Sequence, residues 1–251
     1  MILFPAIDLV AGQVVRLQRG DRARMDVYAN DPVAVAEDFV ARGATWIHVV
    51  DLSATFEEDE EARAANAEAI RAICRVPGVS VDTGGGVRDL AAVERLAEAG
   101  ARRIAIGTAL VRDPEFAARA AAEYGDLVVA DVAARDGQVR VNGWREGEGL
   151  SADELVARLA SLGYRHLVFT DIARDGMQTG IDVGAYRRIA QVAGFPVVAS
   201  GGIATLDDLR ALAQAGPDVV EGAITGRALY EGAFSLEDAL EAAGHVVGQA
   251  S

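Results

Sequence analysis

The second half of this chain repeats the first. Residues 85–100 and residues 201–216 share one pattern, which is a pair of glycines, an amphipathic helical segment and a closing glycine. Four landmarks recur after a shift of 116 to 123 residues, close to half of the 251-residue chain: Asp8 and Asp131, Asp51 and Asp171, Gly86 and Gly202, Gly107 and Gly226. A repeat of this length indicates two copies of one structural unit, so we expect the chain to fold from two related halves.

Short apolar runs alternate with helical segments along the whole chain. Most of the runs are continuous, as in parallel strands that are covered on both faces. Strands are predicted at residues 2–9, 46–51, 79–83, 103–106, 127–132, 166–170, 196–200 and 219–225. Helices are predicted at residues 32–42, 62–73, 89–99, 114–124, 151–162, 183–192, 206–215 and 236–243. Strict alternation of eight strands with eight helices predicts an α/β fold, the (β/α)8 TIM barrel.

No Pro- or Ser-rich linker divides the chain. We therefore expect a single domain over residues 1–251, made of two duplicated half-barrels at about 1–125 and 126–245. Helix boundaries fit this plan, because Asp31-Pro32 and Asp113-Pro114 each place a capping acid before a first-turn proline. An open, doubly wound sheet is the alternative. The closed barrel is favoured because two copies of four βα units make eight.

Composition excludes several classes of protein. A net charge of −14 argues against a nucleic-acid partner, which needs a basic surface. All 24 basic residues are arginine, so no lysine can support a Schiff-base or pyridoxal phosphate mechanism. Cys74 is the only cysteine, which excludes a disulfide framework. No apolar run is long enough to cross a membrane, and no basic region precedes the apolar N-terminus as in a signal peptide; a cytoplasmic protein is expected.

Glycine-rich turns at the predicted strand ends indicate two phosphate sites. Glycine lets backbone N–H groups approach phosphate oxygens, and a following helix N-terminus adds a favourable dipole. The first site is expected from Gly85, Gly86, Gly107 and Thr108, and the second from Gly176, Ser200, Gly201, Gly202, Gly226 and Arg227. The alternative is that these glycines only form tight turns. Two related sets, on strands three and four and on strands seven and eight, favour phosphate binding.

Aspartates end the predicted strands at matching places of the two halves. Asp8 and Asp131 end strands one and five, which lie opposite each other in an eight-stranded barrel. One carboxyl group can take a proton from carbon while the other donates one to a ring oxygen. Asp171 is expected to orient the substrate or the general acid and Thr170 to bind the substrate, whereas Asp51 is expected to be structural. His48 and His166 also match, and are expected to be strand residues without a metal or catalytic role.

Several motifs together resemble the phosphoribosyl isomerases of histidine biosynthesis. They lie at residues 5–9, 15–17, 20–21, 84–88, 106–108, 142–144, 170–172, 174–176, 200–202 and 226–229, and the resemblance covers residues 1–243. It implies a cytoplasmic, monomeric enzyme that isomerises a bis-phosphorylated ribonucleotide, phosphoribosyl-formimino-aminoimidazole carboxamide ribotide, by an Amadori rearrangement without metal or cofactor. Asp8 matches the general base, Asp131 the general acid and Arg16 a residue near the substrate centre. Trp144 lies on the loop after the fifth strand and is expected to stack on the imidazole ring or to close over it.

Three other functions are open. A bifunctional relative also isomerises phosphoribosyl anthranilate, and it carries an arginine where this chain has Asn142. That arginine would pair with the anthranilate carboxylate, so we expect this chain to have negligible activity on phosphoribosyl anthranilate. The sister cyclase, imidazole glycerol phosphate synthase, typically opens with Pro-Cys-Leu-Asp and a nearby lysine, where this chain reads Pro5-Ala6-Ile7-Asp8. A phosphate-binding barrel without catalysis is the third, but it would have no use for opposed acids.

Two segments depart from the family pattern. Five consecutive acids at residues 57–61 follow the second strand, and they are expected to form a flexible, solvent-facing stretch. Asp82 and Thr83 precede the first glycines, and Asp82 is expected to face away from phosphate. These departures bear on substrate details rather than on the class of reaction.

Overall fold

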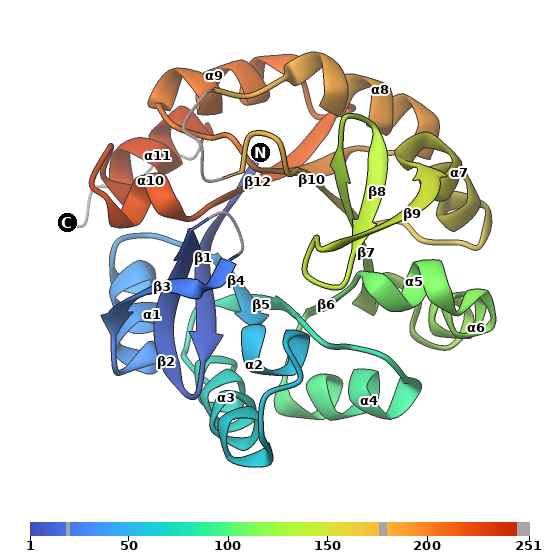
Figure 1. Cartoon of the computed structure of the whole chain (residues 1–251). Helices are drawn as coiled ribbons and strands as arrows, with labels where there is room; N and C mark the ends of the chain where they lie inside the picture. The colour runs from blue at the N-terminus through green and yellow to red at the C-terminus, as the bar shows by residue number, and fades with distance from the viewer. Residues whose placement is uncertain (19–20, 176–179, 245–251) are drawn as a thin grey trace.

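Eight parallel strands close into a barrel in the part of the chain that the computed structural model describes, residues 1–18, 21–175 and 180–244 (Figure 1). In order around the barrel they are β1 (Ile2–Val10), β4 (Trp46–Asp51), β5 (Ser80–Gly84), β6 (Arg103–Ile106), β7 (Val128–Arg135), β10 (Leu167–Asp171), β11 (Val197–Ser200) and β12 (Val220–Thr225). β12 pairs with β1 and β10 pairs with β7, which closes the ring. The predicted barrel is confirmed and the open sheet is excluded.

Helices surround the outside of the barrel (Figure 1). The main ones are α1 (Pro32–Ala41), α3 (Glu60–Ile73), α4 (Leu90–Ala99), α6 (Pro114–Tyr124), α7 (Ala152–Ser161), α8 (Val183–Ala193), α9 (Leu206–Ala215) and α11 (Leu236–Ala242). Their N-termini are capped by side chains as predicted. Asp31 accepts hydrogen bonds from the amides of Val33 and Ala34, and Asp113 accepts one from Phe116. No described helix is long and apolar enough to span a membrane.

Further elements decorate the ends of the strands. An antiparallel hairpin extends β1 after Asp8, and another extends β7 after Asp131. They are completed by β2 (Gln13–Gln18) with β3 (Asp21–Ala29), and by β8 (Gln138–Val141) with β9 (Glu146–Ser151). Short helices also follow the strands, namely α2 (Leu52–Thr55), α5 (Thr108–Arg112) and α10 (Arg227–Tyr230). The predicted boundary between the half-barrels falls at a 3-10 turn, η1 (Gly125–Leu127).

The inside of the barrel is filled in layers, because every second residue of a strand points inward. One apolar layer consists of Phe4, Ala105, Val129, Val168 and Val198. Two residues further along their strands, the last four are followed by Gly107, Asp131, Thr170 and Ser200. The same alternation that builds the apolar layer therefore turns polar groups inward at the carboxyl ends of the strands.

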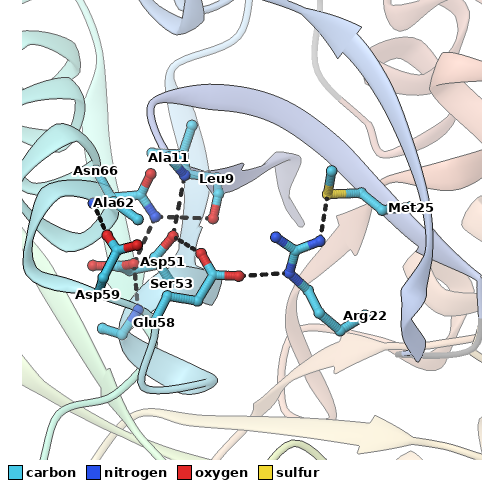
Figure 2. A network of polar contacts seen from close by, with 11 residues as sticks. Leu9, Ala11, Arg22, Met25, Asp51, Ser53, Glu58, Asp59, Ala62 and Asn66 are labelled. Carbon is cyan, nitrogen blue, oxygen red and sulfur yellow. Dashed lines mark hydrogen bonds and ion pairs between the residues drawn. The ribbon is translucent and has the colours of Figure 1, made fainter.

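The acidic run after β4 is part of a polar network and not a flexible stretch (Figure 2). Glu58 accepts a hydrogen bond from the Ser53 hydroxyl at 2.8 Å and one from Arg22 Nε of β3 at 2.6 Å. Asp59 caps α3, whose first turn holds Glu60 and Glu61. Glu57, Asp59, Glu60 and Glu61 are exposed, as expected, but the expectation of a flexible segment was wrong, because Asp59, Glu60 and Glu61 belong to the start of a helix, where acids are favoured. Glu57 remains exposed and pairs with Arg88.

Asn66 of α3 holds the start of the first hairpin against the end of β4 (Figure 2). Its side-chain amide donates to the Leu9 carbonyl and to Asp51 Oδ1, at 2.9 and 2.7 Å, and its oxygen accepts from the Gly12 amide at 2.8 Å. Asp51 also caps α2 through the Ala54 amide. The structural role expected for Asp51 is thus what the contacts show, and it fixes the segment that follows Asp8.

Candidate active site

A cavity of about 640 Å³ opens at the carboxyl ends of the strands. It brings together most of the residues that the sequence predicted for the site: Asp8, Arg16, Gly85, Gly86, Gly107, Thr108, Asp131, Trp144, Thr170, Ser200, Gly201 and Gly226. A small hollow of about 20 Å³ shares Arg16, Gly201 and Gly226 with it and adds Gly202 and Arg227. Asp171 lines neither space, and Gly176 lies outside the described residues.

Asp8 and Asp131 face the cavity from opposite walls. β7 is the fourth strand from β1 in either direction around the ring, so the two carboxyl groups approach the same space from opposite sides. Burial raises the pKa of Asp131 to about 6, against the attraction of His48, and Asp82 raises it further. A carboxyl group with this pKa still carries a proton in part of its population near neutral pH, which suits a general acid.

Gly107 leaves space beside the Asp131 carboxyl group. A Cβ atom placed on Gly107 would lie 3.6 Å from Asp131 Oδ2 and would fill part of the cavity. No described residue donates a hydrogen bond to this carboxyl group. Asp131 is therefore free to exchange hydrogen bonds with a bound molecule.

Arg16 of β2 stands between two carboxylates. Its Nη1 lies 3.0 Å from Asp8 Oδ2 and its Nη2 lies 4.0 Å from Asp175 Oδ1. Burial by itself would lower the pKa of the Arg16 guanidinium, but Asp8 and Asp175 outweigh it, so the pKa is raised. Gly226 makes room for this side chain, since a Cβ atom there would lie 2.9 Å from Arg16 Nη1. The ion pair orients the Asp8 carboxylate toward the cavity.

Gly85 and Gly86 form a turn, here called the first glycine cradle, that is shaped by backbone packing. Gly85 and Gly86 have φ of +101° and +65°, which favour glycine. A Cβ atom on Gly85 would overlap the Asp51 carbonyl oxygen, and one on Gly86 would lie 2.6 Å from Ala54. Thr108 begins α5 next to this turn, so helix-terminal N–H groups without intrahelical partners lie at the same wall. Residues of this turn, together with Thr108 and Arg88, thus line the cavity.

Gly201 and Gly202 form a similar turn in the second half of the chain, here called the second glycine cradle. Gly201 and Gly202 have φ of +89° and +93°. A Cβ atom on Gly201 would lie 2.6 Å from the Asp171 carbonyl oxygen, which corresponds to the Asp51 carbonyl beneath Gly85. Arg227 begins α10 as Thr108 begins α5. The two halves therefore place two turns of the same design at the same cavity.

Asp171 is placed differently from its prediction, and Asp175 was missed. The Asp171 carboxylate accepts from the Ala173 amide and pairs with Arg174 at 3.3 Å, so it shapes the loop after β10 instead of facing the cavity. Asp175 lines the cavity opposite Arg16. Burial raises the pKa of Asp175, while Arg16 counteracts this. The signal was available, because Asp175 directly precedes the predicted phosphate glycine Gly176.

Two loops meet at the rim of the cavity. A Cβ atom on Gly143 would lie 3.3 Å from the Phe56 ring, and the Arg145 guanidinium lies over this ring at 5.4 Å. Trp144 lies between these residues with a φ of +68° and lines the cavity. An aromatic side chain at the mouth can stack on a planar ring. Phe56 was not among the predicted site residues.

A buried pair, His48 and Asp82, also reaches the cavity region. His48 lines the cavity, and its Nδ1 lies 3.2 Å from Asp82 Oδ1. The expectation that His48 is a plain strand residue missed this position. Asp82 is buried and lines neither the cavity nor the small hollow, but its bond to His48 was not foreseen.

Comparison with known proteins relates this chain to enzymes of amino-acid biosynthesis. Residues 2–235 match the family model described as "Histidine biosynthesis protein". A protein of Moorella thermoacetica is 46% identical over 243 residues, 97% of this chain and 98% of the relative. One from Anaeromyxobacter dehalogenans is 44% identical over 97% of this chain and 99% of the relative, and one from Rhodopseudomonas palustris is 44% identical over 96% of each. All three are named 1-(5-phosphoribosyl)-5-((5-phosphoribosylamino)methylideneamino)imidazole-4-carboxamide isomerase.

Proposed function

The chain belongs to the histidine biosynthesis protein family, and we propose that it is the isomerase of its named relatives, with Asp8 and Asp131 as the acid–base pair. The substrate is a ribonucleotide with a phosphate at each end. It is converted from an aminoaldose to an aminoketose. The observation that carries this proposal is that two carboxyl groups face one cavity from opposite walls, with a glycine cradle in each half of the barrel.

The reaction needs one proton donor and one proton acceptor. Asp131 donates its proton to the ribose ring oxygen, the bond from this oxygen to the anomeric carbon breaks, and the adjacent nitrogen forms a Schiff base. Asp8, oriented by Arg16, removes the proton from the neighbouring carbon and leaves an enolamine. The enolamine collapses to the ketone as its hydroxyl proton leaves and the former anomeric carbon gains one. Atoms and electrons balance without any co-reactant.

The two cradles bind the two phosphates. A chain with a net charge of −14 cannot attract a dianionic group by its overall field, so local donors must hold it. Backbone N–H groups at Gly85, Gly86 and Thr108 serve one phosphate, and those at Gly201, Gly202 and Arg227 serve the other. With both ends fixed, the sugar lies between Asp8 and Asp131, which replaces random encounter by a fixed geometry.

Asp175, Thr170 and Trp144 complete the site in this proposal. Asp175 lies beside the Asp8–Arg16 pair, so the positive charge of Arg16 compensates the negative charges of both Asp8 and Asp175. Thr170 and Ser200 end neighbouring strands and offer hydroxyl groups to the sugar. Trp144 stacks on the imidazole ring at the mouth. We further propose that the enzyme acts as a cytoplasmic monomer, which size-exclusion chromatography with light scattering tests for the oligomeric state.

An assay of the purified protein on three reactions tests the function. Turnover of the histidine-pathway aminoaldose, with negligible turnover of phosphoribosyl anthranilate, is expected. Comparable rates on both substrates would instead identify a bifunctional isomerase. Ammonia-dependent ring closure and co-purification with a glutaminase would identify the cyclase. Tight binding of the aminoaldose without any turnover would leave only a phosphate-binding barrel.

A further inference from the structure

His48 and Asp82 form an acid–imidazole pair inside the barrel, outside the acid–base pair described above. The two residues face each other across neighbouring strands, because His48 of β4 is the register partner of Asp82 of β5. Their side chains are 12% and 1% exposed, and His48 Nδ1 lies 3.2 Å from Asp82 Oδ1. The other Asp82 oxygen, Oδ2, is buried without a partner among the described residues. A buried carboxylate with so few partners is costly unless the group beside it carries a positive charge.

The second ring nitrogen of His48 faces the cavity. Nε2 has no protein partner in the described part of the chain, yet it is not among the described atoms that are buried without one. It must therefore be open to the space that His48 lines. Asp82 thus fixes the ring from behind through Nδ1 and leaves Nε2 turned to the substrate side, the arrangement by which a carboxylate orients an imidazole.

The charges around His48 come from three strands. Burial lowers the His48 pKa, but Asp82 of β5, Asp8 of β1 and, in its ionised form, Asp131 of β7 stabilise the protonated ring, and the net effect is a raised pKa. Arg16 and Arg103, two arginines of the described barrel interior, each pair with an acid, Asp8 and Glu221, which compensates their positive charge.

We infer that Asp82 is a positioning residue that keeps His48 as an imidazolium, so that Nε2–H is a fixed hydrogen-bond donor to the substrate between Asp8 and Asp131. The inference rests on the proposed isomerase function. His48 lies on the strand next to Asp8, so its donor is close to the carbon that Asp8 deprotonates. The oxygen on that carbon becomes the ketone oxygen, and an N–H donor stabilises it as carbonyl character develops. No proton is transferred by His48 in this step.

The charge on Asp82 decides whether His48 Nε2 donates or accepts a hydrogen bond. While Nδ1–H donates to residue 82, a neutral ring has only a lone pair on Nε2 and can accept but not donate a hydrogen bond. The imidazolium presents an N–H there instead. Asp82→Asn keeps the size and an oxygen acceptor for Nδ1–H, but it removes the negative charge that stabilises the cation. The substitution therefore changes the donor into an acceptor without moving the ring.

Ring nitrogen NMR reads this charge state directly. The chain has three histidines, His48, His166 and His245, so His166→Gln and His245→Gln variants assign the His48 resonances. At about pH 7.5 the wild-type His48 ring is expected to have both nitrogens protonated, whereas Asp82→Asn is expected to show the neutral ring with the proton on Nδ1. A neutral His48 in the wild-type protein at this pH would overturn the inference. The measurement needs no substrate, so it stands even if the proposed isomerase activity is absent.

The kinetic test is the ratio of wild-type to Asp82→Asn kcat as a function of pH. Near about pH 8 we expect Asp82→Asn to lose about tenfold to a hundredfold in kcat, the range for loss of one charge-assisted hydrogen bond. The loss should shrink toward about pH 5.5, where the His48 ring of the variant regains its proton. The pKa of Asp131 depends on the charges of His48 and Asp82 and therefore differs between the two proteins, so the pH at which the ratio changes must match the His48 titration followed by ring nitrogen NMR. A loss that is constant with pH would indicate a merely structural role and would contradict the inference.

The second half of the chain provides a matched control. His166 Nδ1 lies 3.2 Å from Glu221 Oε2 in an acid–imidazole pair whose carboxylate also binds Arg103, and neither His166 nor Glu221 lines the cavity. Glu221→Gln should change the His166 resonances and leave kcat within about twofold of wild type at every pH, because no donor at the cavity is altered. Equal pH-dependent losses in both variants would sink the inference. Should Asp82→Asn fail to fold, the wild-type resonances still decide the charge state, and His48→Gln should give a kcat loss smaller at high than at low pH, since an amide donor does not titrate.

Discussion

Arg16 Nη1 lies 3.0 Å from Asp8 Oδ2, and the same guanidinium lies 4.0 Å from Asp175 Oδ1. One partly buried cation thus serves two partly buried carboxylates, which come from β1 and from the loop after β10. The sequence separates these residues by more than half of the chain, and only closure of the barrel brings them together. The relationship links the stability of the site to its activity.

Replacing Arg16 should therefore affect both properties. Arg16→Gln leaves Asp8 and Asp175 without their shared cation, so we expect the free energy of unfolding to fall by about 3 kcal/mol and kcat/KM to fall strongly. Arg16→Lys keeps the charge but lacks the fork that reaches two carboxylates, so an intermediate loss is expected. Urea denaturation and steady-state kinetics measure the two effects. Full activity in Arg16→Gln would show that the ion pair does not orient Asp8.

The two proposed acid–base groups can be removed without changing side-chain size. Asp8→Asn and Asp131→Asn should each lower kcat by at least about 100-fold, because each variant keeps its shape but cannot carry the proton. Asp171→Asn is the control, since Asp171 lies outside the cavity and should retain far more activity. Near-normal kcat in either of the first two variants would remove that residue from the mechanism.

The pH dependence of activity should report on Asp131. Its pKa is raised to about 6 by burial, and a general acid works only while it holds its proton. We therefore expect kcat/KM, which reports the free enzyme, to decline as the pH rises through about 6. A profile that stays flat from about pH 5 to 8 would argue against Asp131 as the acid.

The raised pKa of Asp131 also makes a prediction about stability. Between the ordinary value of 3.8 and about 6, the folded state holds a proton that the unfolded state releases. Stability from this group is therefore present at low pH and is lost as the pH rises through about 6. Above this window Asp131→Asn should be more stable than wild type, by about 1 to 3 kcal/mol. Denaturation of both proteins at about pH 4 and pH 7.5 checks the sign, and a less stable variant at the higher pH would contradict it.

Alanine substitutions at Gly85 and Gly163 distinguish the cost of backbone strain from the cost of steric overlap in the free energy of unfolding. Their φ values are +101° and +104°, but a Cβ atom meets the Asp51 carbonyl at Gly85 and nothing within 4 Å at Gly163. Gly163→Ala should cost about 1 kcal/mol of unfolding free energy, the strain of the left-handed conformation alone. Gly85→Ala should cost about 3 kcal/mol or more and raise KM, because the first cradle must move. Equal costs in calorimetry would mean that the turn relaxes freely.

Asn66 should be one of the least replaceable polar residues of the described chain. It is fully buried and bonds Gly12, Leu9 and Asp51 at 2.7 to 2.9 Å. Asn66→Ala leaves a backbone amide and a carbonyl unpaired, so a loss of about 2 to 4 kcal/mol is expected. Gln13→Ala on the same hairpin removes one exposed hydrogen bond and should change stability by less than about 0.5 kcal/mol. Similar losses in thermal unfolding would show that Asn66 does not fix the hairpin.

The sequence by itself determined the barrel and most of its site. Continuous apolar strands, capped helices and the half-length repeat allow few other folds, and each predicted strand and helix ends within three residues of its place in the structure. The polar residues and glycines at the ends of the strands had to converge, because the carboxyl ends of parallel strands share one face of a barrel. Asp8, Asp131 and the two glycine cradles could be identified for that reason.

Only the tertiary structure decided which side chains meet. Asp171 ends β10, and Asp175 lies in the loop that follows it. The path of this loop turns the Asp175 side chain toward Arg16, whereas Asp171 pairs with Arg174. His48 and Asp82 meet through the register between β4 and β5, which the hydrophobic pattern does not specify to the residue. Glu58 was read as part of a solvated run because its partners Ser53 and Arg22 lie on other elements. Local patterns fix what each segment becomes, whereas contacts between distant segments depend on register and loop path, which arise only when the barrel closes.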